Sequence, residues 1–320
     1  MLIALTFAAS LVVGLIVTPV VREIAKRLDL LDHPGAHRKV HQFPVPRLGG
    51  VAMAIAFAAG IAVAFISSGG DLQAAGGLQP NRAPAILAGV SLLLIVGVID
   101  DTRGMRALIK LAAQVAAALL AFGLGLTLDR LSLPGDVEVE LGALALPVTV
   151  AWIVGVINAV NLIDGLDGLA SGVVLTVLGA FGVLAAVDGV DPTLFLIAAS
   201  VGAAAGFLAY NLHPATIIMG DTGSMFLGFV VAAIGISLMQ DGVHPVPPWV
   251  PVIALGVPIL DTIWAIVRRT ARGTAFYLAD RGHVHHQLLR GGLSQRDAML
   301  SLTAVSGVLA MIALILGRSS

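Results

Sequence analysis

The sequence contains no cysteine and little charge. Without cysteine the chain has no disulfide bonds, no thiolate metal ligands and no cysteine nucleophile. Only 12% of its 320 residues are charged, against about a quarter in an ordinary soluble domain. Together with a hydrophobic content of 58%, this shortage of charge argues against a water-soluble fold.

The sequence offers instead repeated apolar runs that are long enough to cross a bilayer, which takes about 20 residues per helix. We predict an all-α polytopic membrane protein that forms a single domain over residues 1–320. The first span is expected to be retained, because basic residues follow it rather than precede it. The ten predicted spans are 1–21, 48–67, 83–99, 107–127, 143–160, 169–187, 193–211, 222–240, 249–267 and 299–316.

The basic residues divide unevenly between the two sets of connections. If the chain alternates sides, Arg82, Arg130 and Arg318 fall in one set and the other 15 of the 18 Lys and Arg residues in the second set. The positive-inside rule places this second set in the cytoplasm and both termini outside, in the cell inner (cytoplasmic) membrane. Among the outer connections, SLPGDVEVEL alternates apolar and acidic residues around a Pro-Gly pair and predicts a small β-hairpin near 131–141.

Two adjacent carboxylates end the third predicted span. Asp100 and Asp101 lie in GVIDDTRG, and like charges this close repel each other unless a cation or basic partner neutralises them. Lys110 follows in the first turns of the next span, where its ammonium could return to the same interface and meet a phosphate. The plainer alternatives are a solvated helix end for the aspartates and a snorkelling lysine at the membrane surface.

The densest polar motif is NAVNLIDGLDGLASG, in which Asn158, Asn161, Asp164 and Asp167 recur at every third residue. On a helix each step of three residues turns the side-chain direction by about 60°. We therefore expect Asn161, Asp164 and Asp167 to face one side of a helix, with the glycines of the motif loosening the backbone or admitting a ligand. The alternative is that these polar groups only bond to neighbouring helices.

A third motif, HPATIIMGDTGSMFLG, places Asp221 between two glycines at a predicted helix start. Such a start offers free backbone N–H groups to an anion, and an adjacent carboxylate can hold a hard cation that bridges to it. An ordinary helix cap is the alternative.

The last inner connection contains ADRGHVHHQLLR, with His283, His285 and His286 close to Arg281. Clustered histidines suggest a transition metal, but no thiolate or second carboxylate set lies nearby, and the arginine favours an anionic ligand such as phosphate. The first inner loop, DHPGAHRKVHQFPVPRLGG, carries Lys39 and His41. Its basic residues would attract anionic lipid, while its prolines and paired glycines predict a rigid, shaped loop.

All five polar segments fall on the basic side, which is expected if they form one site. They lie near 22–47, 100–106, 161–168, 212–222 and 268–298. A cytoplasmic site that combines Asp, Asn, Lys, Arg and His fits magnesium-assisted transfer of a phosphate group, where catalysis is mostly positioning and charge neutralisation.

At this level of detail the chain resembles the polyprenyl-phosphate N-acetylhexosamine-1-phosphate transferases. The resemblance rests on RKVHQFPVPRLGG, the aspartate pair with its lysine, NAVNLIDGLDGLASG, GDTGS and DRGHVHHQLL, in order over nearly the whole chain. The segment from His283 to His286 has Val284 between its histidines. It resembles the branch that begins teichoic acid, O-antigen or related envelope glycans, whereas the muramoyl-pentapeptide branch usually shows three consecutive histidines.

This resemblance implies a reaction between a UDP-N-acetylhexosamine, most often UDP-N-acetylglucosamine, and undecaprenyl phosphate. The products are a diphosphate-linked lipid sugar and UMP, with Mg²⁺, or Mn²⁺, as the cofactor. Direct attack by the lipid phosphate is favoured over a covalent aspartyl intermediate. The expected partners are the two substrates, the membrane and, by resemblance only, a second copy of the chain; no nucleic acid is expected.

The resemblance also implies roles for individual residues. Asp221 would hold the metal with Asn161 as a second ligand, and Lys110 would contact the diphosphate. Asp100 or Asp101 would deprotonate or orient the lipid phosphate, and Asp164 and Asp167 would organise the nucleotide side. The remaining substrate contacts would be Lys39, His41, Asn158, Arg281, His283, His285 and His286.

Two other functions stay open at this point. A muramoyl-pentapeptide phosphotransferase would share the chemistry but take a larger donor. An ion-coupled transporter would place acidic groups near the middle of its spans. Only Asp261, in VPILDTIWAIVRR, lies that deep, and a buried carboxylate that supports the site is the plainer explanation for it.

Overall fold

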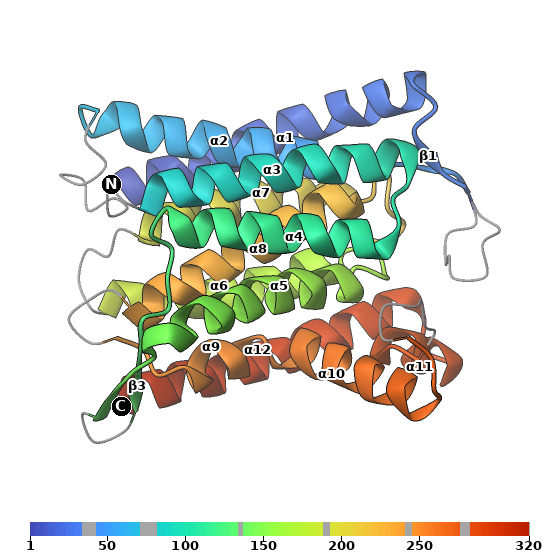
Figure 1. Cartoon of the computed structure of the whole chain (residues 1–320). Helices are drawn as coiled ribbons and strands as arrows, with labels where there is room; N and C mark the ends of the chain where they lie inside the picture. Colours follow the sequence, from blue (N-terminus) through green and yellow to red (C-terminus); the bar gives the residue numbers. More distant parts are fainter. Residues whose placement is uncertain are drawn as a thin grey trace.

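A computed structural model of the chain describes residues 1–33, 43–70, 82–133, 137–187, 193–240, 245–275 and 282–319. Within these ranges the fold is a bundle of helices that lie side by side along one direction (Figure 1). The helices are α1 (Leu2–Arg27), α2 (Gly49–Ser67), α3 (Arg82–Arg103), α4 (Ala107–Gly123), α5 (Ala145–Ile163), α6 (Leu169–Val187), α7 (Thr193–Asn211), α8 (Gly220–Gln240), α9 (Trp249–Ala254), α10 (Gly256–Ala271), α11 (Val284–Arg290) and α12 (Gln295–Ser319). The short strands are β1 (Leu31–Asp32), β2 (Val45–Pro46), β3 (Arg130–Leu133) and β4 (Val137–Glu140), and a 3₁₀ turn, η1 (Gly142–Leu144), precedes α5.

The helices follow the predicted spans closely. Eight of them are long and apolar enough to cross a membrane, and α4 is a shorter apolar helix. The predicted span 249–267 is the exception, because it consists of two helices, α9 and α10, that meet at Leu255. Pro258 explains the break, since proline cannot donate to the carbonyl four residues back and its ring crowds that carbonyl, here the one of Ala254. The prediction of an all-α polytopic membrane protein is confirmed.

Helix α8 lies at the centre of the bundle. Its span is buried along its whole length, and it packs against α2, α3, α5, α6 and α7. Small residues permit this packing, because helices in a bilayer gain most from close van der Waals contact. A Cβ at Gly89 of α3 would overlap the ring of Phe229, and one at Gly228 would overlap the backbone of Ile157. The start of α8 is therefore fixed in the middle of one end of the bundle.

The two ends of the bundle differ. The turn between α3 and α4, strand β1 and helix α11 lie at one end, while both termini and strand β3 lie at the other (Figure 1). This arrangement is the one that the alternating topology requires, because the basic-rich connections share an end and the termini share the opposite one.

The predicted hairpin is present at the end that holds the termini. Strands β3 and β4 pair antiparallel, with Arg130 opposite Glu140 and Leu133 opposite Val137. Gln240 at the end of α8 holds the base of the hairpin: its side-chain oxygen accepts from the amide of Asp129 at 3.0 Å, and its Nε2 donates to the Arg130 carbonyl at 2.7 Å. The Pro-Gly pair itself lies outside the described residues.

The contact between α1 and α7 provides a test of the packing. A Cβ at Gly202 would lie 2.5 Å from the Phe7 carbonyl oxygen and 2.7 Å from Cβ of Ser10. We expect Gly202→Leu to separate the two helices. Overpacking typically costs about 1–3 kcal/mol, so the free energy of unfolding should fall by at least that amount. Gly179→Leu is the matched control, because nothing lies within 4 Å of a Cβ at that exposed position. Equal melting temperatures of the two purified variants in detergent would contradict this packing.

Candidate active site

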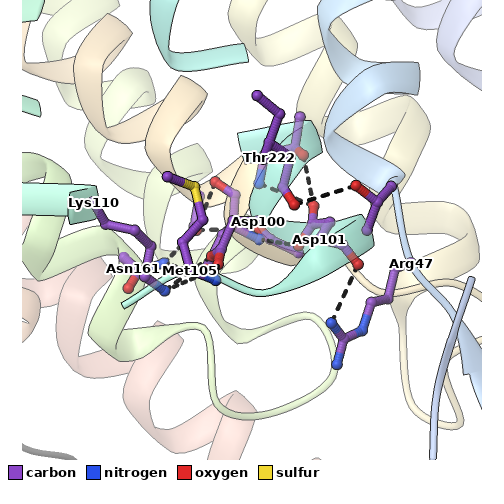
Figure 2. A network of polar contacts seen from close by, with 12 residues as sticks. Arg47, Asp100, Asp101, Met105, Lys110, Asn161 and Thr222 are labelled. Atoms are coloured by element: carbon purple, nitrogen blue, oxygen red, sulfur yellow. Dashed lines mark hydrogen bonds and ion pairs between the residues drawn. The ribbon is translucent and has the colours of Figure 1, made fainter. Parts of the chain in front are cut away.

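The site is built around the first turn of α8. Gly220 has a φ of 71°, and a Cβ at this position would overlap the carboxylate of Asp101. Asp101, in the last turn of α3, accepts hydrogen bonds from the backbone N–H of Asp221 at 2.9 Å and of Thr222 at 3.1 Å, and from the Thr222 hydroxyl at 2.6 Å. One carboxylate thereby caps α8 from a neighbouring helix (Figure 2).

This cap corrects one expectation from the sequence. The GDTG segment does begin a helix, but the amides of Asp221 and Thr222 are not open to an anionic ligand, because Asp101 accepts from both. A carboxylate from another helix satisfies the same orphan donors that a bound phosphate would satisfy. Sequence spacing could not predict this pairing, which joins residues 120 positions apart.

The adjacent Asp100 points to a different set of partners. Its Oδ2 lies 2.9 Å from the Lys110 ammonium, and its Oδ1 accepts from the backbone N–H of Met105 at 2.5 Å. The same ammonium lies 2.6 Å from Oδ2 of Asp221. Lys110 thus bridges two carboxylates, but only one of them, Asp100, belongs to the adjacent pair, because Asp101 accepts from α8 instead. Lys110 and Asp221 keep about a quarter of their side chains exposed, at 25% and 26%, while Asp100 is buried beneath them at 6%.

Asn161 completes this group from the last turn of α5. Its Nδ2 donates to Oδ1 of Asp221 at 2.6 Å and to the hydroxyl of Ser224 at 2.8 Å. The ends of α3 and α5 and the beginnings of α4 and α8 therefore place one ammonium, two carboxylates and one carboxamide within direct contact. We call Asp100, Lys110, Asn161 and Asp221 the polar cluster; Figure 2 shows its surroundings.

The expectation that Asn161, Asp164 and Asp167 share one helical face is wrong. Helix α5 ends at Ile163, and α6 begins only at Leu169. Gly168 lies directly before α6 and has a φ of 75°, which a helix cannot accommodate, so it keeps α6 separate from the turn that follows α5. The four polar residues of the motif therefore have separate environments.

Asn158 and Asp167 bond to neighbouring helices and loops rather than to the polar cluster. Asn158 donates to the side-chain oxygen of Gln114 on α4 at 2.6 Å. Asp167 is 4% exposed, and its Oδ2 contacts Nδ1 of His213 at 2.8 Å and accepts from the amide of Ala215 at 3.0 Å. The contacts of Asp167 with His213 and Ala215 fix the loop between α7 and α8. The roles predicted for both residues, substrate binding and catalysis, stay predictions.

Asp164 lies between α5 and α6 in a strongly negative environment. It keeps some solvent exposure, but the protein surrounds it. Burial raises the pKa of its carboxyl to about 8, and the negative charges of Asp221, Asp101 and Asp167 act in the same direction. Three other carboxylates thus repel a negative charge on Asp164, and a divalent cation bound near them would relieve this repulsion.

The described part of the first inner loop and the start of α2 are held against the segment that leads into α8. The amide of Ile218 donates to the Pro46 carbonyl at 2.9 Å, and the amide of Gly50 donates to the Met219 carbonyl at 2.9 Å. Arg47 forms an ion pair with Asp32 and donates to the main-chain carbonyl of Asp101 at 3.4 Å (Figure 2). These contacts agree with the predicted rigid loop. Lys39 and His41 lie outside the described residues.

The histidine segment forms the fifth part of this end of the bundle. His285, in α11, is 2% exposed, and its ring lies so close to Gly165 that a Cβ there would overlap it. Burial lowers the pKa of its imidazole to about 3, and His286 and His283 contribute to the shift. Its Nδ1 has no hydrogen-bond partner among the described residues. The neutral ring of His285 therefore packs against the turn between α5 and α6, while Arg281 lies outside the described residues.

The five predicted segments thus meet at one end. Contacts link the first loop to the α3–α4 turn, that turn to α8, α8 to the end of α5, and the α5–α6 turn to α11. Sequence reasoning missed several residues that make these links. Thr222 and Ser224 belong to the GDTGS segment and His213 begins its motif, but their partners come from distant parts of the chain. Arg47 was counted only as a topology marker.

No group of three or more His, Cys, Asp or Glu side chains is arranged to hold a metal ion anywhere in the described ranges. A cation at the polar cluster would take only one or two protein ligands. That is the usual arrangement for Mg²⁺, which keeps waters and binds substrate phosphates in the rest of its coordination shell.

Fold and site together define a polytopic membrane protein that gathers carboxylates, a lysine and histidines at the basic-rich ends of its helices. A family model described as "Glycosyl transferase family 4" matches residues 83–239. The chain belongs to this family. A relative in Bacillus subtilis (strain 168), named "Probable undecaprenyl-phosphate N-acetylglucosaminyl 1-phosphate transferase", is 38% identical over 315 residues, covering 98% of this chain and 85% of that protein.

Two further relatives carry related names. The "Decaprenyl-phosphate N-acetylglucosaminephosphotransferase" of Mycobacterium tuberculosis (strain ATCC 25618 / H37Rv) is 34% identical over 331 residues, covering 96% of this chain and 81% of that protein. The "Undecaprenyl-phosphate alpha-N-acetylglucosaminyl 1-phosphate transferase" of Escherichia coli (strain K12) is 28% identical over 299 residues, covering 91% and 77% respectively. The family resemblance seen in the sequence motifs is confirmed.

Proposed function

We propose that the protein transfers N-acetylglucosamine 1-phosphate from UDP-N-acetylglucosamine to undecaprenyl phosphate and releases UMP. The polar cluster carries this proposal. Three helix ends converge to place two carboxylates within 2.9 Å of one ammonium, and a fourth brings the carboxamide of Asn161 to 2.6 Å from Asp221. The names of the relatives supply the acceptor lipid and the transferred group.

The donor set of the polar cluster suits magnesium. Asp221 offers a carboxylate that is partly exposed, and Asn161 offers a carboxamide oxygen once its amide turns. Carboxylate and amide oxygens are ligands that hard cations prefer. Asp221 and Asn161 would hold the ion, and the ion would supply charge neutralisation on the diphosphate of the donor.

The chain's own residues account for the rest of the reaction. An oxygen of the lipid phosphate attacks the phosphorus that carries the sugar, the bond from that phosphorus to the bridging oxygen breaks, and UMP leaves with that oxygen. Lys110 already lies between two anionic groups, so its ammonium can exchange a carboxylate for a substrate phosphate without being desolvated further. Asp100, beneath it, holds the lysine in place and keeps it charged.

The side of the membrane follows from charge. We place the polar cluster at the cytoplasmic face, because 15 of the 18 basic residues belong to connections on that side in the alternating topology. A lipid phosphate is anchored at the membrane surface and a nucleotide sugar is a soluble anion. Helix ends at that surface are where the two substrates can meet.

The structure favours this proposal over an ion-coupled transporter. A transporter needs ionisable groups along its spans, whereas the polar cluster lies at helix ends, in the last turn of α3 and α5 and the first turns of α4 and α8. Among the described residues, Asp261 is the carboxylate that lies deeper in a helix; it is 6% exposed and bonds to His283. The muramoyl-pentapeptide alternative is disfavoured by the names of the relatives and by the interrupted histidine motif.

Metal removal provides the direct test. The purified protein, given undecaprenyl phosphate and UDP-N-acetylglucosamine, is expected to release UMP with Mg²⁺ and to stop when EDTA is added. Excess Mg²⁺ should restore the rate, since chelation removes the ion without altering the chain. The control is the same reaction with UDP-N-acetylmuramoyl-pentapeptide, from which no UMP is expected. UMP release from that donor alone would show that the protein is a muramoyl-pentapeptide phosphotransferase instead. UMP release that EDTA does not affect would rule out a role for a divalent cation.

A further inference from the structure

Asp261 is a buried carboxylate that the proposed reaction does not use. It lies on α10 more than two turns before the end of that helix and is 6% exposed. Its neighbours on the same helix point outward, because Leu260, Ile263 and Trp264 are all exposed. An ionisable side chain in a predicted span is costly unless a partner satisfies it. Asp261 therefore faces inward from a helix at the periphery of the bundle, and it needs a partner there.

That partner is the start of the histidine segment. Oδ2 of Asp261 lies 2.7 Å from Nδ1 of His283, and Oδ1 accepts from the backbone N–H of Val284 at 2.8 Å. Val284 is the first residue of α11, so the carboxylate satisfies one of the free amides at that helix start. Both oxygens are thus used to hold one seven-residue helix against α10.

The second nitrogen of His283 is also engaged inside the protein. Its Nε2 lies 3.4 Å from the guanidinium of Arg269, which can only donate. Nε2 must then accept, and Nδ1 carries the proton that is donated to Asp261. The arrangement fixes one tautomer, and at 5% exposure His283 has little surface left for a substrate.

We propose that Asp261 is a positioning residue that holds α11 through His283, so that His285 stays packed against the turn between α5 and α6 with His286 beside it. His285 stacks on His283 with ring centroids 5.8 Å apart and planes 6° apart, and its ring centroid lies 4.3 Å from that of His286. A shift of His283 is therefore passed on to both. This assigns His283 a different role from the substrate contact expected from the sequence.

The effect on turnover rests on the proposed transferase function. Asp261→Asn keeps an oxygen for the amide of Val284 but presents an amide where His283 needs an acceptor. Nδ1 of His283 must then accept, and its proton moves to Nε2. The Nε2–H would face the guanidinium of Arg269, so that two donors meet without an acceptor. We expect kcat/KM for UDP-N-acetylglucosamine to fall by about 10–100-fold, as small misplacements near a reacting centre do, with the KM for undecaprenyl phosphate unchanged. Thr262→Val is the matched control, because its hydroxyl bonds only within α10, to Pro258.

Variants of His283 separate this role from substrate binding. His283→Asn retains a side-chain N–H that can reach Asp261, whereas His283→Ala retains none. We expect the asparagine variant to keep most of the activity and the alanine variant to match Asp261→Asn. In the double variant Asp261→Asn/His283→Ala the losses should not multiply, because both changes break the same contact. Multiplied losses, or equal damage from both His283 variants, would overturn the proposal.

Hydrogen exchange tests the same contact without any substrate. In the full-length protein in detergent, Asp261→Asn should speed exchange of the amides at 284–290 and leave α3 and α8 as in the parent protein. Unchanged exchange in α11 would overturn the proposal even if turnover falls. If the parent protein releases no UMP from any donor, the transferase function fails, and faster exchange in the variant would still support the clamp on α11.

Discussion

Asp221→Asn is expected to lower UMP release by at least 10²–10³-fold, roughly the loss that follows removal of one group that stabilises developing charge. Asparagine keeps an oxygen that can accept from Asn161, and Lys110 keeps its ion pair with Asp100. The fold should therefore persist. What the variant loses is the negative charge that would hold a divalent cation on the diphosphate.

The measurement is the initial rate of UMP release by purified variants in detergent with undecaprenyl phosphate and saturating Mg²⁺, alongside the melting temperature of each variant. Asp297→Asn is the matched control. It is also an acidic residue in the first turn of a helix at the same end of the bundle, but its partner is Ser294 and it lies at an exposed position. Parent-like turnover by Asp221→Asn at the Mg²⁺ concentration that saturates the parent protein would show that Asp221 is not a metal ligand.

The spans were predictable because the hydropathy of a segment depends only on the residues within it. Each predicted segment coincides with a helix, apart from 249–267, where Pro258 divides the span. The pairing of helices was not predictable in the same way. Nothing in the sequence of α8 states that it is central, although its small residues at Gly228 and Gly235 are what allow Ile157 and Trp152 to approach it.

The sequence predicted which segments meet at this end of the bundle, but not which of their residues bond to one another. Topology placed the five polar segments on one side, and the structure brings them into contact. The error lay in the assumption that period-three spacing implies a continuous helix, because Gly168 takes a φ of 75° and the chain turns between α5 and α6. Hydrogen bonds across 60 or more positions, such as Asn161 to Asp221, depend on packing that no local pattern encodes.

The adjacent aspartates at the end of α3 are expected to differ in how the same substitution affects the stability of the protein. Asp100→Asn removes the negative charge beside Lys110 but keeps an oxygen for the amide of Met105. Turnover should fall by about 10²-fold, because a misplaced lysine no longer meets the diphosphate correctly. The melting temperature should stay close to that of the parent protein, since Lys110 retains Asp221.

Asp101→Asn should instead destabilise the protein. Each oxygen of Asp101 accepts from one backbone amide, of Asp221 or of Thr222. An asparagine has one such oxygen, so whichever way its amide turns, one buried N–H of α8 is left without an acceptor. An unsatisfied buried donor costs about 1–3 kcal/mol. Turnover should fall as well, because Asp221 shifts with the helix that carries it.

Turnover alone does not distinguish the roles of Asp100 and Asp101, whereas turnover and melting temperature measured together do. If Asp101 were the group that orients the lipid phosphate, its asparagine variant would lose turnover at an unchanged melting temperature, as expected of Asp100→Asn. Asp101→Ala sharpens the comparison, because it leaves both amides and the Thr222 hydroxyl without their shared acceptor and should melt lower still. A parent-like melting temperature for the alanine variant would show that α8 keeps its place without the cap. Because α8 is the central helix and Asp221 lies in its first turn, the structure predicts that the stability of the fold and the position of Asp221, the proposed metal ligand, depend on the same carboxylate, that of Asp101.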